Sequence, residues 1–307
     1  MIINLPRTTI RDINRRLLLE RDEGGAIALG RVLTLIIDAG DRDPEGAIDA
    51  ARDASLEHPC RVIVLTRADT VRGAELDAQI RLGGDAGASE VIILRTSGEL
   101  DEHVDTLVVP LLLPDAPIVV WWPYQAPTNP SQHPLGKLAA RRITDSTECD
   151  RPAVTLNYLG RHYREGDTDL AWTRATRWRG LLAATLDQPP FEPVQRVVIA
   201  GEGTHPSLDL LGAWLGWALR CPVEIIRQDT PLAITQVRLE RASGPIVLDR
   251  PDGREAILSQ PGQPSHRIAL PIRELRECLA EELRRLDADE VYGEVLQDGL
   301  QLLEDQP

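Results

Sequence analysis

The chain has 307 residues, of which 42% are hydrophobic and 27% charged, a composition typical of an ordinary globular protein. Its formal net charge of −14 argues against nucleic acid or a membrane surface as a partner, because both repel an acidic protein. The apolar runs are too short to span a bilayer and the N-terminus has no secretory pattern, so we expect a cytoplasmic protein.

The first half of the chain, residues 1–165, predicts an α/β domain. A buried-strand pattern at 31–37 is followed by Asp43-Pro44-Glu45, which combines a capping side chain with a proline in the first turn of a helix. A second apolar strand follows at 61–66, and strand, helix and strand of these lengths form a βαβ unit with parallel pairing. The other elements expected in this half are a helix at 9–20, strands at 76–82, 90–95 and 117–122, and a helix at about 135–142.

The second half, residues 166–307, predicts another α/β domain. We place the boundary near Gly166, where the periodicity is interrupted, and expect a helix at 169–186. A strand at 195–200, a helix at 207–220 and a strand at 222–227 form a second βαβ unit. Four short strands then alternate with turns such as Asp252-Gly253, which indicates an antiparallel meander. A last helix starts at Pro271, so the fold class is α/β in both halves.

The residues that commonly carry catalysis form no recognisable constellation. The cysteines are far apart and never in a CxxC pair, which gives no support for a zinc or thioredoxin-like site. The six histidines have no metal-ligand spacing, and no G-x-S-x-G elbow is present. We therefore expect no metal, no cofactor and no enzyme activity, and four reduced thiols. These are Cys60, Cys149, Cys221 and Cys278.

Two glycine-bearing loops keep a phosphate-binding alternative open. The loop at 201–203 follows a strand and precedes a helix, where backbone amides often bind anions. However, Pro206 replaces the third glycine of a dinucleotide fingerprint, and Glu202 would repel a phosphate. The loop at 83–87 lacks the Lys-Ser/Thr ending of a Walker loop. Tight turns are favoured, and a phosphosugar- or nucleotide-binding enzyme or sensor is the alternative function. The glycines concerned are Gly83, Gly84, Gly87, Gly201 and Gly203.

Tryptophan and arginine side chains suggest a surface for a partner protein, because both types are enriched at binding hot spots. On the helix predicted at 169–186, Arg174 is four residues from Trp178, so its guanidinium can lie over that indole. The competing interpretation is that Trp172 and Trp178 only seal the two domains together. The candidate partner-facing or scaffolding residues are Trp121, Trp122, Asp167, Asp169, Trp172, Arg174, Trp178 and Arg179.

The stretch Asp-Thr-Asp-Leu-Ala-Trp-Thr-Arg at 167–174, continued by Trp178-Arg179, resembles the signature of the OpcA family of glucose-6-phosphate dehydrogenase assembly proteins. Segments 30–35, 58–64, 81–90, 114–123 and 140–145 are similar to the family too, in the same order. The resemblance implies a non-catalytic factor that assembles and allosterically activates glucose-6-phosphate dehydrogenase. That enzyme opens the oxidative pentose phosphate pathway and makes NADPH.

Overall fold

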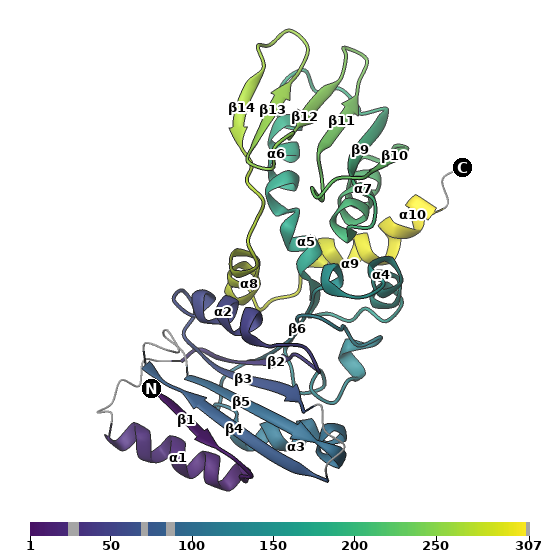
Figure 1. Cartoon of the computed structure of the whole chain (residues 1–307). Helices are drawn as coiled ribbons and strands as arrows, with labels where there is room; N and C mark the ends of the chain where they lie inside the picture. The colour runs from purple at the N-terminus through teal and green to yellow at the C-terminus, as the bar shows by residue number, and fades with distance from the viewer. Residues whose placement is uncertain (24–30, 69–72, 84–89, 305–307) are drawn as a thin grey trace. The chain divides into compact units, whose positions relative to one another are not determined.

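The computed structural model describes residues 1–23, 31–68, 73–83 and 90–304 (Figure 1). Contacts divide the chain into two compact units. Unit 1 comprises Met1–Glu148, Gly166–Thr168 and Leu275–Ala288, and unit 2 comprises Cys149–Glu165, Asp169–Glu274 and Asp289–Pro307. Each unit therefore includes segments from both predicted halves, residues 1–165 and 166–307. No helix in the described ranges is long and apolar enough to cross a membrane.

Within the described part of the chain, unit 1 is built on an eight-stranded sheet. Its strands and main helices are β1 (Ile2–Leu5), α1 (Ile10–Glu23), β2 (Leu33–Asp38), α2 (Glu45–Ala54), β3 (Cys60–Arg67), β4 (Glu75–Arg81), β5 (Glu90–Ser97), α3 (Val104–Val108), β6 (Ile118–Trp122), β7 (Arg141–Thr144), β8 (Asp167–Asp169) and α8 (Leu275–Arg284). Short 3₁₀ helices are η2 (Gly98–Glu102), η3 (Val109–Leu111), η4 (Pro130–Gln132) and η5 (Ser146–Glu148). The strand order is β1-β4-β5-β3-β2-β6-β7-β8, and β2 pairs in parallel with β3 across α2. This confirms the first βαβ unit.

Helices cover both faces of the unit 1 sheet (Figure 1). Side chains of α1 and α3 pack with alternate residues of the central strands on one face, and α8 packs against α2 on the other. The position of α8 is fixed by charge as well as by apolar contact. Arg141 of β7 pairs with Glu282 at 2.5 Å, and Arg284 pairs with Glu57 at 2.8 Å.

The helix predicted at about 135–142 is wrong. That segment begins with a turn and continues into β7, which pairs in parallel with β6. Both arginines at the start of β7, Arg141 and Arg142, are buried. Their guanidinium groups bond to Glu282 and Asp167 within unit 1, and such pairing makes a charged side chain acceptable inside a sheet layer.

Unit 2 contains a six-stranded sheet in the residues that the structure describes. Its elements are α4 (Pro152–Arg161), α5 (Leu170–Arg174), α6 (Thr176–Leu186), β9 (Arg196–Glu202), α7 (Pro206–Leu219), β10 (Val223–Gln228), β11 (Gln236–Glu240), β12 (Ile246–Asp249), β13 (Glu255–Ser259), β14 (His266–Ala269), α9 (Glu290–Glu294), the π-helix η6 (Val295–Gly299) and α10 (Leu300–Glu304). The strand order is β10-β9-β11-β12-β13-β14. Parallel pairing of β9 with β10 confirms the second βαβ unit, and antiparallel pairing from β11 to β14 confirms the meander.

One face of the unit 2 sheet is packed against α6 and α7 in a continuous apolar cluster. The predicted last helix corresponds to α8, which begins at Leu275 rather than Pro271. It is followed by α9, η6 and α10, of which η6 and α10 pack on α7 (Figure 1). The sequence did not predict these three helical segments. They frame one side of the site described below.

Candidate partner-binding site

The tryptophan and arginine residues predicted on one helix lie on two short helices of unit 2. Asp169 caps α5, because its Oδ1 accepts a hydrogen bond from the Ala171 amide at 2.9 Å. Ala175 separates α5 from α6. Across this break, the Arg179 Cζ lies 3.4 Å from the centre of the Trp172 ring. The structure therefore brings Trp172 and Arg179 together in a cation–π contact.

Trp178 belongs to the apolar cluster under the unit 2 sheet and is 2% exposed. The Arg250 Cζ lies 5.1 Å from the centre of the Trp178 ring. The helix predicted at 169–186 is interrupted at Ala175, and the contact of Arg174 with the Trp178 indole stays a prediction. Burial lowers the pKa of Arg250. Its side chain donates to the Ile234 carbonyl at 2.7 Å.

Trp121 and Trp122 end β6 in unit 1, and both are buried because helices cover both faces of that sheet. The Trp122 ring makes an edge contact with His133, with 5.3 Å between ring centres. Burial lowers the pKa of His133. The indole nitrogen of Trp121 has no hydrogen-bond partner in the residues described. Asp167, in the same unit, is buried and ion-paired with Arg142. These positions favour the scaffolding role over direct contact with a partner.

The glycine loop after β9 has a structural explanation. A Cβ on Gly201 would lie 2.1 Å from the Ala233 carbonyl oxygen, so a side chain would block the approach of β9 to that segment. The Gly203 amide donates to the Gln228 carbonyl at 3.2 Å, and the Thr204 amide to the Glu202 carboxylate at 3.1 Å. These amides are used within the fold rather than directed at an anion. Gly83 has a positive φ of 71°, whereas Gly84 and Gly87 lie outside the described residues.

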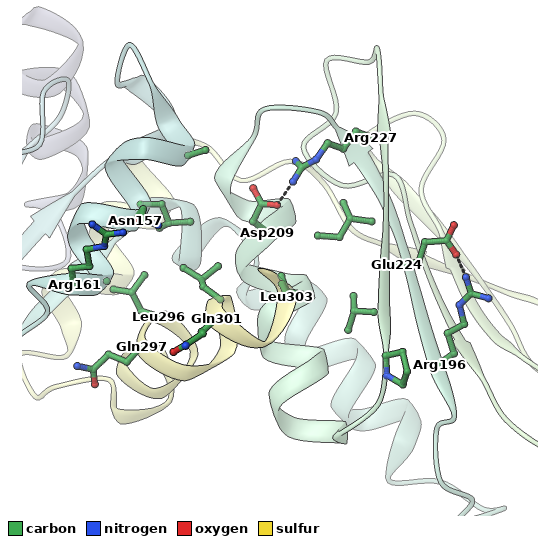
Figure 2. Close-up of a pocket in the computed structure, with 17 residues that line it drawn as sticks. Asn157, Arg161, Arg196, Asp209, Glu224, Arg227, Leu296, Gln297, Gln301 and Leu303 are labelled. Atoms are coloured by element: carbon green, nitrogen blue, oxygen red, sulfur yellow. Dashed lines mark hydrogen bonds and ion pairs between the residues drawn. The ribbon is translucent and has the colours of Figure 1, made fainter. Parts of the chain in front are cut away.

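A groove of about 1210 Å³ lies entirely within unit 2 (Figure 2). Its walls come from α4, from β10 with the start of α7, and from the segment 296–303. Its apolar lining is contributed by Leu156, Val223, Ile225, Leu296, Leu300 and Leu303. Sequence reasoning missed this groove because its walls come from three distant segments. The leucine spacing at 296, 300 and 303 was its only available signal.

Charged side chains stand at the rim of this groove. Figure 2 shows two ion pairs, Asp209 with Arg227 at 2.7 Å and Glu224 with Arg196. Burial raises the pKa of Asp209 above its ordinary value, and the nearby Arg227 offsets this only in part. Arg161, at the end of α4, is exposed at the opposite wall. The arrangement combines an apolar interior with an arginine-rich edge and contains no catalytic constellation among the lining residues.

Comparison with known proteins gives a consistent assignment over most of the chain. Residues 51–161 match the glucose-6-phosphate dehydrogenase subunit N-terminal domain, and residues 165–296 match the C-terminal domain of the same subunit. The putative OxPP cycle protein OpcA of Synechococcus elongatus is 31% identical over 192 residues. That match covers 57% of this chain and 42% of the relative, so the chain spans less than half of the relative's length.

Solved structures resemble the chain only loosely. An oxidoreductase from Pseudomonas syringae is 13% identical, with a TM-score of 0.40 and coverage of 90% of this chain and 91% of that one. The myo-inositol dehydrogenase of Lactobacillus casei is 9% identical, with a TM-score of 0.46 and coverage of 90% and 96%. These values support no inference about activity. The two consecutive domain matches do identify the chain, which belongs to the OpcA family of glucose-6-phosphate dehydrogenase assembly proteins.

Proposed function

We propose that this chain is a non-catalytic assembly factor and allosteric activator of glucose-6-phosphate dehydrogenase. The observation that carries the proposal is the match of both subunit domains, in order, over residues 51–161 and 165–296. A cytoplasmic location and support of NADPH production in the oxidative pentose phosphate pathway belong to the same proposal. The apolar lining of the groove in unit 2 suits a binding role.

Activation by such a protein is a matter of linkage. A chain that binds the active arrangement of the dehydrogenase more tightly than the inactive one shifts the equilibrium by the difference in binding free energy. A difference of about 3 kcal/mol is sufficient for a shift of roughly a hundredfold. No covalent step is required. The protein needs only a surface that is rigid enough to discriminate between the two arrangements.

We propose that the buried tryptophans and their arginines supply this rigidity. Trp172 is held by Arg179 on one face and by a hydrogen bond from its indole nitrogen to Asp289 at 2.8 Å. Trp178 is held under the unit 2 sheet beside Arg250. In unit 1, Trp121 and Trp122 fix the end of β6. In this role the tryptophans shape the partner-facing surface without being exposed on it.

The direct test is NADPH production by the purified dehydrogenase of the same organism, with and without this chain. A large increase in rate or in apparent substrate affinity supports activation. No change under both reducing and oxidising conditions rejects it. Arg174→Ala and Arg179→Ala, compared with the wild type at equal folded concentration, test the scaffold. Unchanged activation and complex formation by both variants would remove these two arginines from the proposal.

A further inference from the structure

Within the described part of unit 2, the edge strand β10 presents unused backbone groups to the groove. In a β-strand, the N–H and C=O groups of one residue point to the same side of the strand, and those of the next residue point to the other side. The Pro222 carbonyl accepts from the Val197 amide at 2.9 Å, and the Gln228 carbonyl accepts from the Gly203 amide at 3.2 Å. Even-numbered residues of β10 therefore bond to β9. The backbone groups of Ile225 and Arg227 point away from β9, toward the open edge of the sheet.

The groove beside this edge is apolar in its interior. Ile225 lines it from the strand side, while Leu300 and Leu303 line it from α10. A Cβ on Gly212 of α7 would lie 3.4 Å from the Ile225 Cδ1, so α7 packs closely behind the edge strand and supports it. Part of the facing wall is the π-helix η6, an element often found at functional sites. The edge is thus held in a fixed position next to apolar side chains.

The charge at the rim favours a carboxylate. Arg196 and Arg227 are paired with Glu224 and Asp209. Arg161 is exposed, and no hydrogen bond or ion pair of its side chain is found among the described residues. In a chain with a net charge of −14, this groove is a place where an approaching acidic side chain meets positive charge at close range.

We propose that the groove binds an extended, apolar segment of the partner dehydrogenase, which adds as a strand to β10 and places a carboxylate on Arg161. The inference rests on the proposed function for the identity of the partner. Strand addition uses the backbone groups of Ile225 and Arg227 for affinity and the apolar lining for side-chain selection. The volume of about 1210 Å³ exceeds the roughly 300–1,000 Å³ of ordinary small-molecule sites. A peptide segment accounts for this size.

Photo-crosslinking tests the location of the partner. A benzophenone amino acid replaces Gln301, which is exposed and lines the groove. The matched control is the same replacement at Gln263, an exposed glutamine outside the groove. With the full-length chain and the purified dehydrogenase, we expect a cross-link from position 301 to one extended segment of the enzyme and none from position 263. A cross-link from neither position, or equally from both, overturns the groove assignment.

Two substitutions test how the segment is held. Ile225→Pro removes an edge amide that does not bond to β9, and proline is tolerated at such edge positions. Arg161→Glu reverses the rim charge, and Arg151→Glu, at the exposed start of the same helix, is its control. We expect each groove variant to weaken binding of the dehydrogenase at least about tenfold, and the control to change it less than about twofold. If Ile225→Pro does not fold, Arg161→Glu and the cross-link decide.

These experiments distinguish a failure of the groove inference from a failure of the proposed function. If the wild-type chain binds and activates the dehydrogenase but both groove variants bind normally, the groove inference fails and the proposed function stands. If only Ile225→Pro binds normally, strand addition is rejected. If the wild-type chain neither binds nor activates the enzyme, the proposed function fails and the inference fails with it.

Discussion

The Asp289 carboxylate joins two parts of unit 2 that are distant in sequence. One of its oxygens accepts a hydrogen bond from the Trp172 indole at 2.8 Å, and the other accepts one from the Tyr292 amide at 3.0 Å. The first contact reaches back to α5, while the second caps α9. A single carboxylate therefore caps the first of the C-terminal helices and connects it to the contact between Trp172 and Arg179.

Replacing Trp172 by Phe should destabilise the protein beyond the loss of ring volume. The substitution removes the hydrogen bond to Asp289, and a hydrogen bond to a charged group contributes about 1.5–3 kcal/mol. Trp121→Phe is the control, because the Trp121 nitrogen has no partner among the described residues. In urea unfolding we expect Trp172→Phe to lose about 2 kcal/mol more than Trp121→Phe. Equal losses would mean that the Asp289 contact adds no stability.

Gly201→Ala should be strongly destabilising, because its Cβ would lie 2.1 Å from the Ala233 carbonyl oxygen. Overpacking of this kind costs about 1–3 kcal/mol or more. Gly180→Ala is the matched control. Gly180 lies inside α6, and a methyl group added there would meet nothing within 4 Å, so alanine should stabilise by roughly 0.5–1 kcal/mol. Thermal melting of both variants checks the opposite signs. A neutral Gly201→Ala would contradict the packing explanation of this loop.

Asp209 should make stability depend on pH in the direction opposite to a favourably paired carboxylate. Burial raises its pKa in the folded state, so the folded chain binds a proton there more readily than the unfolded chain. Its contribution to stability therefore increases as pH falls through the raised pKa and is least favourable at neutral pH. Asp209→Asn removes this dependence. In urea unfolding, we expect the free energy of unfolding of the variant, relative to that of the wild type, to be higher at pH 7 than at pH 4. A relative gain at pH 4 instead would reverse the assignment.

The buried pair of Arg141 and Glu282 should be far more important than the exposed pair on the same helix. Glu282→Ala leaves the Arg141 guanidinium buried without its carboxylate, and breaking a buried pair costs about 3–5 kcal/mol. Arg284→Ala breaks the pair with Glu57, whose side chains are 61% and 57% exposed, so it should cost less than about 1 kcal/mol. Chemical denaturation of both variants measures how much each substitution lowers the free energy of unfolding. Similar losses would show that α8 is held by its apolar face alone.

The fold class followed from the sequence because its signals are local. The apolar run at 61–66 is typical of a buried strand, and Asp252-Gly253 is typical of a hairpin turn. β7 was missed because sequence patterns predict that arginine side chains are exposed. Arg141 and Arg142 are buried only because they pair with Glu282 and Asp167. The formation of this strand therefore depends on contacts with residues that are distant in the sequence.

The candidate site was harder to predict from the sequence for the same reason. The sequence predicted a helix that begins at Asp169, and in the structure this residue caps α5. The contact between Trp178 and Arg250 was not predicted, because Arg250 directly follows β12 in a distant part of the sequence. The groove combines α4, β10 and α10, and no window of sequence contains all three. Sequence patterns indicate which side chains are unusual, whereas the contacts between distant segments determine what they do.

The exchange of segments between the two units has a consequence for synthesis. Unit 1 takes α8 from residues 275–284, after the whole unit 2 sheet has been translated. While the chain emerges from the ribosome, the surface of α2 that α8 later covers is complete but unoccupied, and apolar surface left open in this way invites misassembly. Unit 2 likewise waits for residues 289–304 to close over α7. Both units therefore reach their final packing only after residues 275–304 have been translated.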